Sequence, residues 1–317
     1  MVAASPPGIF SCRTVGDTPL VELSRLSPAP GVRLFAKLEW FNPTGSIKDR
    51  VACSMLDAAA AAGELWPGRR ILEPSSGNTG IALAMQGRMR GFEVTIVMPA
   101  GSTPEREQMM RLFGADVIFS PADQGSNGAV KLAQEIAAKD DRYVMLFQYA
   151  NEWNPRAHYE GTGAEIVRDL PRVDAVVAGL GTGGTLMGTA RRVRESHPDV
   201  VIAAAEPQPG DPVMGLRSLE DGYVPPILDV TKLDRKLLVS NAESVAAVNA
   251  LLEKEGILAG VSAGAVIHVA RRIAEEQPEG ANVVAILADG GWKYLSADFW
   301  RAGAGELEES METTLWW

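Results

Sequence analysis

The sequence predicts an α/β protein made of two three-layer α/β/α domains with mostly parallel sheets. Segments with strand and helix patterns alternate along most of the 317 residues, and this order is typical of parallel sheets covered by helices. Apolar stretches such as "VVAILA" (283–288) have no polar face, as expected for strands that are buried on both sides. A polar, turn-rich segment at 151–163 separates two such series, so we expect two domains.

The first series extends to about residue 150. One of its helices has Pro104 near its start and another is closed by Gly91, which are common helix boundary signals. An earlier, apolar helix is expected after the turn-forming stretch "NPTGS" (42–46). The expected strands cover 69–76, 93–100, 115–121 and 143–150, and the expected helices cover 79–91, 103–114 and 128–141.

The second series follows the polar segment and contains an irregular stretch rich in Pro and Gly at 207–226. Its expected helices cover 164–170, 186–196, 244–256 and 263–277, and its expected strands cover 173–180, 200–207 and 282–291. The predicted domain limits are 42–150 for a smaller domain, 11–41 with 151–300 for a larger domain, and 301–317 for a C-terminal tail.

The overall charge and hydrophobicity restrict the partners of the chain. A net charge of -10 argues against nucleic acid or an anionic membrane as the main partner, because phosphate-rich surfaces require clustered Lys and Arg. No apolar run approaches the roughly 20 residues of a membrane span, and the N-terminal stretch lacks the pattern of a signal peptide. We therefore expect a cytoplasmic protein.

The cysteines and histidines do not predict a metal site. Cys12 and Cys53 form no Cys-x-x-Cys pair and can make at most one disulfide, which fits a reducing compartment. Cys53 falls in an apolar helix, so we expect an inert buried thiol rather than a nucleophile. His158, His197 and His268 lie far apart, without metal-ligand spacing.

A glycine-rich loop, "GLGTGGT" (179–185), lies between an expected strand and an expected helix. Glycines allow the backbone to approach an anion closely, and the start of a helix adds a favourable potential. The loop matches neither the Rossmann pattern nor the P-loop pattern. It predicts a phosphate site, with a glycine-rich packing turn as the alternative.

A second polar loop, "PSSGNTG" (74–80), joins another strand to another helix. Its hydroxyl, amide and backbone donors at a helix start suit a carboxylate, although one of these residues is also expected to cap the helix. Two anion sites at the carboxyl ends of strands predict a cleft that holds a phosphorylated cofactor and a substrate with a carboxylate. Lys48, directly after the "NPTGS" turn, could form a Schiff base in this cleft.

Seven short motifs occur in an order that is typical of one enzyme family. These are "GDTPLVEL" (16–23), "KLEWFNPTGSIKDR" (37–50), "EPSSGNTGIALA" (73–84), "GLGTGGTLMG" (179–188), "AEPQ" (205–208), "GVSAGA" (260–265) and "LADGGWKYL" (287–295). Over nearly its whole length the chain resembles the pyridoxal-phosphate-dependent cysteine synthase family, which has the two-domain fold of the tryptophan synthase β type. The resemblance implies that pyridoxal 5′-phosphate (PLP) binds in the cleft between the domains.

The resemblance also implies a role for individual residues. Lys48 matches the lysine that forms the Schiff base and then acts as general base, while Asn78 matches the residue that hydrogen-bonds the ring hydroxyl of PLP. Ser262 matches the serine that faces the pyridine nitrogen, and a neutral partner there favours β-elimination over transamination or racemisation. The residues matching the phosphate cradle are Gly181, Thr182, Gly183, Gly184 and Thr185. Those matching the pocket for the substrate carboxylate are Ser75, Ser76, Asn78, Thr79 and Gln148, with Ser75 standing where the family often has threonine.

The implied reaction is β-replacement through an α-aminoacrylate, and the sequence offers one indication of its substrate. Family members that use O-acetylserine have a stretch similar to "GIGxGF" at the place where this chain has "GLRSLEDGYVP" (215–225). Arg217 in that stretch could bind a phosphate bidentately, or it could be a surface residue paired with Glu220 or Asp221. The arrangement resembles the actinobacterial branch that uses O-phospho-L-serine and takes sulfur from a thiocarboxylated sulfur-carrier protein.

Several alternatives remain open at this point. O-acetylserine sulfhydrylase or cystathionine β-synthase-type chemistry would use the same motifs, because the nucleophile attacks after elimination. A non-catalytic ligand-binding protein of the same fold is a more distant alternative. Sulfide could replace the carrier protein as the sulfur donor, and the family also implies a homodimer. The tail ending in Leu315, Trp316 and Trp317 could fold into the cleft and exclude water, or it could form a dimer contact.

Overall fold

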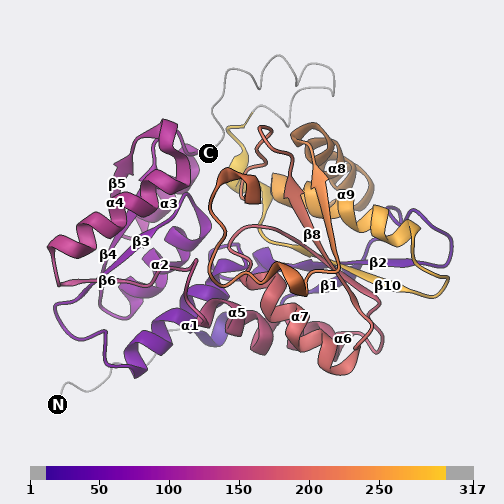
Figure 1. The fold of residues 1–317 in the computed structure, drawn as a ribbon, viewed down its shortest axis with the longest axis horizontal. Helices are drawn as coiled ribbons and strands as arrows, with labels where there is room; N and C mark the ends of the chain where they lie inside the picture. Colours follow the sequence, from indigo (N-terminus) through magenta and orange to yellow (C-terminus); the bar gives the residue numbers. More distant parts are fainter. Residues whose placement is uncertain (1–11, 298–317) are drawn as a thin grey trace.

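Ten strands form two separate sheets in the computed structural model, which describes residues 12–297 (Figure 1). The larger sheet has six strands in the order β1-β2-β10-β7-β8-β9, and the smaller has four in the order β5-β4-β3-β6. Among the strand pairs of the described residues, only β1–β2 is antiparallel. The larger sheet contains β1 (Leu20–Glu22), β2 (Arg33–Leu38), β7 (Ala175–Gly179), β8 (Val201–Pro207), β9 (Arg235–Val239) and β10 (Asn282–Leu287).

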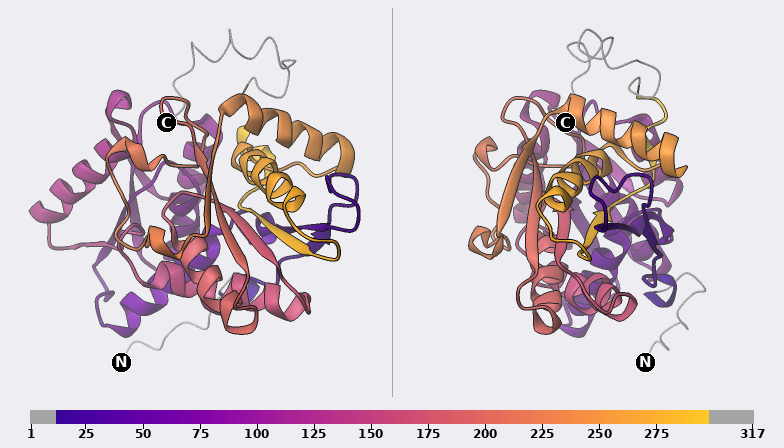
Figure 2. Two further views of the ribbon diagram at one scale, coloured as in Figure 1. Left: turned by 45° about the vertical axis from the view of Figure 1, so that its right-hand side comes forward. Right: turned by 90° about the vertical axis from the view of Figure 1, so that its right-hand side faces the viewer.

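Helices cover both faces of the six-stranded sheet. The alternation of side chains in β10 separates two cores, because Val283 and Ala285 pack with α8 and α9 while Val284 and Ile286 pack with α6 and α7. Figure 2 shows these two helix pairs on opposite faces of the sheet. The helices are α6 (Gly163–Asp169), α7 (Gly184–Ser196), α8 (Asn241–Glu255) and α9 (Val261–Glu275).

The four-stranded sheet is covered in the same way. One face carries α1, α2 and α3, whose apolar side chains share a core with Ile71 and Ile96, and the other face carries α4, which packs on Leu72 and Val97. The strands are β3 (Arg70–Pro74), β4 (Glu93–Pro99), β5 (Asp116–Ser120) and β6 (Tyr143–Met145). The helices are α1 (Lys48–Ala61), α2 (Asn78–Met89), α3 (Pro104–Leu112) and α4 (Gly125–Lys139).

The structure confirms the predicted fold class and most of the predicted elements. Strands β1, β2 and β9, the short helix α5 (Trp153–Ala157) and the π-helical turn at His158–Thr162 were not predicted, and β6 ends five residues earlier than expected. Phe147 has a φ of 53°, outside the strand region, and its N–H donates to the Glu73 carboxylate instead of to a neighbouring strand.

The domain limits remain a prediction, but the sheets divide at corresponding places. All four strands of the smaller sheet lie between residues 70 and 145, inside the predicted 42–150 segment. The predicted tail at 301–317, with Leu315, Trp316 and Trp317, lies outside the described residues. Within residues 12–297, none of the helices combines the length and hydrophobicity needed to cross a membrane.

A buried ion network joins helix α1 to the body of the six-stranded sheet. Arg50 lies in the first turn of α1, and its guanidinium donates to the carboxylates of Glu39 and Glu165 at 2.6–3.0 Å. Burial would raise the pKa of Glu165, but the hydrogen bonds and charge of Arg50 and Lys37 lower it to about 2. Glu165 therefore stays ionised, and the network fixes the helix end that carries Lys48.

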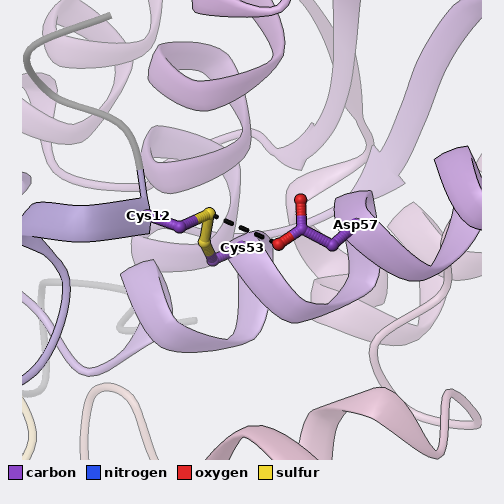
Figure 3. A group of neighbouring side chains, drawn as sticks. All are labelled: Cys12, Cys53 and Asp57. Atoms are coloured by element: carbon purple, nitrogen blue, oxygen red, sulfur yellow. Dashed lines mark hydrogen bonds between the residues drawn. A yellow bond between two sulfur atoms is a disulfide. The ribbon is translucent and has the colours of Figure 1, made fainter. Parts of the chain in front are cut away.

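A disulfide corrects the expectation of a free Cys53 thiol. Cys53 on α1 is bonded to Cys12, and their Cα atoms are 5.8 Å apart (Figure 3), within the usual range for such a bond. Asp57 lies beside the pair, and its carboxylate forms an ion pair with the Arg90 guanidinium at 2.7 Å. The sequence allows only this one pairing but does not show that it forms, because Cys12 and Cys53 are 41 positions apart and meet only when the segment around Cys12 packs on α1.

The Arg50 network yields a test of what holds α1 in place. Arg50→Met should lower the free energy of unfolding by about 3–5 kcal/mol, because it leaves the buried Glu39 carboxylate without a cation and Glu165 with Lys37 alone. Arg235→Met is the matched control, since Arg235 forms an exposed pair with Glu276 and such pairs contribute little. Chemical denaturation of both variants measures the difference, and equal effects would contradict a stabilising role for the buried network.

Candidate active site

A cavity of about 480 Å³ opens between the two sheets, where loops follow the carboxyl ends of strands from both. Such edges are the usual ligand sites of open α/β sheets. The cavity brings together ten of the predicted site residues: Lys48, Ser75, Ser76, Asn78, Thr79, Gln148, Gly181, Thr182, Arg217 and Ser262. Gly183, Gly184 and Thr185 follow directly on Thr182 but do not line the cavity.

Lys48 is the first residue of α1 and lines the cavity. Gly45, with a φ of 78°, closes the preceding turn, and the Ile47 N–H donates to the Ala288 carbonyl at 2.8 Å. The Lys48 pKa is lowered by burial, while the charges of Asp289 and Glu39 oppose the shift. A lowered pKa increases the fraction of neutral amine, which is the form that can attack a carbonyl.

The glycine loop joins β7 to α7 and has the geometry of an anion cradle. Gly183 has a φ of 86°, in the left-handed region that glycine tolerates. A side chain at Gly184 would overlap Asn154, so only glycine allows this close approach. The α7 N-terminus adds a favourable potential for a phosphate, and the loop therefore fits the phosphate of PLP.

Asn154 on α5 is a site residue that the sequence did not indicate. Its Nδ2 donates to Thr182 Oγ1 at 3.0 Å and to the Gln148 carbonyl at 2.9 Å. It thus connects the glycine loop with the segment expected to bind the substrate carboxylate. Its stretch, "NEWNPRAH", looks like an ordinary turn in the sequence.

His158 contacts the start of α7 through Thr185. Its Nε2 lies 3.3 Å from Thr185 Oγ1, and its Nδ1 lies 3.1 Å from Thr162 Oγ1. Burial, with the nearby charges of Lys48 and Arg50, holds the pKa of His158 well below its usual range. The ring is therefore neutral at physiological pH and serves as a hydrogen-bonding spacer.

The predicted carboxylate loop is more internally bonded than the sequence suggested. Ser75 Oγ accepts from the N–H groups of Gly77 and Gly80. The N-cap residue of α2 is Gly77, so the expectation of a polar N-cap side chain is wrong, although Ser75 bonds an N–H group of the first turn. Thr79 Oγ1 donates to Gln148 Oε1 at 2.7 Å. Within residues 12–297 the Ser76 hydroxyl makes no hydrogen bond, and it is the most available side-chain donor of the loop.

Glu73 positions the Gln148 segment and was not predicted as a site residue. Its carboxylate accepts from the N–H groups of Phe147 at 2.7 Å and Gln148 at 2.9 Å. Burial raises its pKa to about 8, and these two backbone hydrogen bonds limit the rise. Glu73 lies near the end of β3, where the sequence pattern predicts a strand and gives no sign that this side chain holds another segment.

Ser262 is the second residue of α9 and lies in the cavity wall. Its hydroxyl makes no hydrogen bond with the side chains and backbone that the structure describes, so it is free to meet a ligand. A serine hydroxyl is neutral and both donates and accepts, as expected for a partner of a pyridine nitrogen.

Asn78 lines the cavity and lies at the centre of a cluster of hydrogen-bonded side chains. Its Oδ1 accepts from Lys293 Nζ at 2.8 Å, and its Nδ2 donates to Asp289 Oδ2 at 2.7 Å. Tyr294 donates its hydroxyl to the same Asp289 oxygen. The sequence placed these three partners in the "LADGGWKYL" motif without assigning them a role, because 211 to 215 positions separate Asp289 and Lys293 from Asn78.

Arg217 is buried, with 9% of its surface exposed. Its Nη1 donates to Asn127 Oδ1 at 3.1 Å, and the guanidinium lies over the rings of Tyr149 and Tyr223. Arg217 is not paired with Glu220, so the alternative of a surface arginine paired with that residue is wrong. Arg217 lines the cavity, as do Asn127 and Tyr149 beside its guanidinium, and it forms no ion pair with the side chains that the structure describes.

Comparison with known proteins identifies the family. The family model for "Pyridoxal-phosphate dependent enzyme" matches residues 12–289. The chain is 38% identical to a "Probable cysteine synthase" of Bacillus subtilis over 298 residues, covering 90% of this chain and 96% of that protein. It is 40% identical to "Cysteine synthase B" of Salmonella typhimurium over 285 residues, covering 90% and 93%.

Solved structures show the same similarity. The crystal structure of a cysteine synthase from Entamoeba histolytica superposes with a TM-score of 0.85 at 32% identity, covering 98% of both chains. That of O-ureido-L-serine synthase gives a TM-score of 0.86 at 35% identity, covering 94% of this chain and 98% of the other. The chain therefore belongs to the family of pyridoxal-phosphate-dependent enzymes and is a transferase of the cysteine synthase type.

Proposed function

We propose that this enzyme makes L-cysteine by β-replacement on O-phospho-L-serine. The observation that carries the proposal is that buried Arg217 lines the cavity and that its guanidinium has no carboxylate partner among the described side chains. A buried cation is costly unless it is paired, and a phosphate offers two oxygens to the planar guanidinium. An acetyl group provides no such charge.

The location of Arg217 supports binding of the leaving group rather than of the cofactor phosphate. Its backbone N–H donates to the Leu180 carbonyl at 2.7 Å, which fixes it beside the glycine loop while its side chain points to Asn127 on α4. The two tyrosine rings around the guanidinium limit its rotamers. A phosphate bound there would contact both the six-stranded unit through Arg217 and the four-stranded unit through Asn127.

The remaining roles are proposed for residues of the same cavity. PLP, when bound, withdraws electrons from the substrate Cα and so promotes loss of the β-substituent. Lys48 would hold the cofactor covalently, and its amine, once the substrate amino group has displaced it, would be placed to remove the Cα proton. Gly181, Thr182, Gly183, Gly184 and Thr185 hold the phosphate, Asn78 and Ser262 orient the ring, and Ser75, Ser76, Asn78, Thr79 and Gln148 surround the substrate carboxylate.

The sulfur source, assembly and location are proposed on family grounds. A thiocarboxylated sulfur-carrier protein or sulfide supplies the sulfur, and the enzyme acts as a homodimer in the cytoplasm. An O-acetylserine-dependent cystathionine β-synthase from Helicobacter pylori has a similar fold, with a TM-score of 0.85 at 31% identity. The substrate test below therefore includes O-acetylserine.

Lys48→Ala should fold normally but lose covalent attachment of PLP, because it removes the only amine proposed to form the bond. Borohydride reduction followed by peptide mass spectrometry measures this directly. Wild type should carry the reduced cofactor on Lys48, and Lys131→Ala, a change at an exposed α4 position, should behave as wild type. Labelling at another lysine in wild type would disprove the assignment.

Arg217→Leu should lower kcat/KM for O-phospho-L-serine by about 10- to 100-fold, the loss expected for hydrogen bonds to a charged group. The rate with O-acetylserine should change little, because the acetyl group gains nothing from the guanidinium. Arg111→Leu serves as control, since Arg111 is exposed and pairs within α3. A wild-type preference for O-acetylserine that persists in Arg217→Leu would overturn the phosphoserine proposal.

A further inference from the structure

Lys293 is a second lysine at the candidate active site, and none of the proposed roles above uses it. It lies in the 3-10 helix Gly291–Tyr294 and is fully buried, with 0% of its surface exposed. Its Nζ is 2.8 Å from Asn78 Oδ1. Asn78 begins α2 on the four-stranded unit, whereas Lys293 follows β10 of the six-stranded unit, so this hydrogen bond connects the two.

The surroundings of Lys293 determine its charge. Burial lowers its pKa to about 8, with Asp289 and Asp49 favouring the charged form and Arg106 and Lys48 opposing it. The amine is therefore still mostly protonated at neutral pH. An ammonium group can only donate hydrogen bonds, so it selects the oxygen of the Asn78 amide.

Asp289 selects the other end of the same amide. Its carboxylate accepts from Asn78 Nδ2 at 2.7 Å and from the Tyr294 hydroxyl. If the amide were turned over, its NH₂ would face the ammonium of Lys293 and its oxygen would face the carboxylate of Asp289. Both contacts would be repulsive, so the two charges fix one orientation of the amide.

This fixed orientation leaves one donor for a ligand. A side-chain amide has two N–H hydrogens, and Asp289 takes one of them. The second hydrogen of Nδ2 remains available, and Asn78 lines the cavity. The amide oxygen, in contrast, is occupied by Lys293.

We infer that Lys293 is a positioning residue that holds the Asn78 amide with its nitrogen toward the ring hydroxyl of PLP. The inference rests on the proposed function, in which Asn78 contacts that hydroxyl. A donated hydrogen bond stabilises the ionised form of the ring hydroxyl over the neutral form. Lys293 thereby influences the cofactor through Asn78, without touching it.

The test measures PLP binding and the absorbance spectrum of the bound cofactor, neither of which requires turnover. Lys293→Met replaces the ammonium with an uncharged chain of similar length. We expect the Kd for PLP to rise about tenfold or more, as for loss of a hydrogen bond involving a charged group. The absorbance of bound PLP should also shift from the ionised toward the neutral ring form.

Asn78→Ala and the double variant make the test specific. If Lys293 acts through Asn78, Lys293→Met should change neither the Kd nor the spectrum further once Asn78 is alanine. Equal effects in both backgrounds would overturn the inference, as would an unchanged spectrum in folded Lys293→Met. Lys131→Met, at an exposed position, should leave both quantities unchanged.

Two further measurements separate the possible failures. Near-ultraviolet circular dichroism reports whether Lys293→Met folds, and if it does not, Lys293→Gln takes its place in the same four-variant comparison. The Lys293→Gln effect should likewise disappear in the Asn78→Ala background. If wild type does not bind PLP through Lys48, the proposed function fails. If it does and the coupling is absent, only the inference about Lys293 fails.

Discussion

The geometry of the site depends on the ion network around Arg50. Helix α1 belongs to the four-stranded unit, but its first turn carries Lys48 into the cavity, and Arg50 anchors that turn to Glu39 and Glu165 of the six-stranded unit. Four charges are buried together, because Lys37 also pairs with Glu165. Removing Arg50 would leave the Glu39 carboxylate without a cation. The network therefore links the two units at the helix turn that carries Lys48.

The cavity follows from this arrangement of the sheets. Parallel strands end at one edge, and the loops after β3, β6, β7 and β10 converge there from both units. Several residues connect these loops without lining the cavity centre. Asn154 joins the glycine loop to the Gln148 segment, and Glu73 holds that segment by its backbone.

Buried charge gives each side of the cavity a different chemistry. Around Lys48, burial lowers the amine pKa and increases its nucleophilic form. Around Asn78, Lys293 and Asp289 orient a neutral amide by opposite charges. Arg217 lines the cavity and its cation has no carboxylate partner among the described side chains, which makes that region suitable for an anion.

The sequence by itself determined the α/β class and most helices and parallel strands, because these depend on local hydrophobic periodicity. It also indicated two candidate anion-binding loops, through glycine and hydroxyl residues at strand-to-helix junctions. It also marked Lys48, through the turn before α1. Only the tertiary structure brought together Asn78 with Lys293, Thr182 with Asn154, and Cys12 with Cys53. Each of these pairs joins distant parts of the chain, and the sequence around one partner carries no information about the other. The burial of Arg217 could not be predicted for the same reason, because Tyr149, which packs against its guanidinium together with Tyr223, is distant in the sequence.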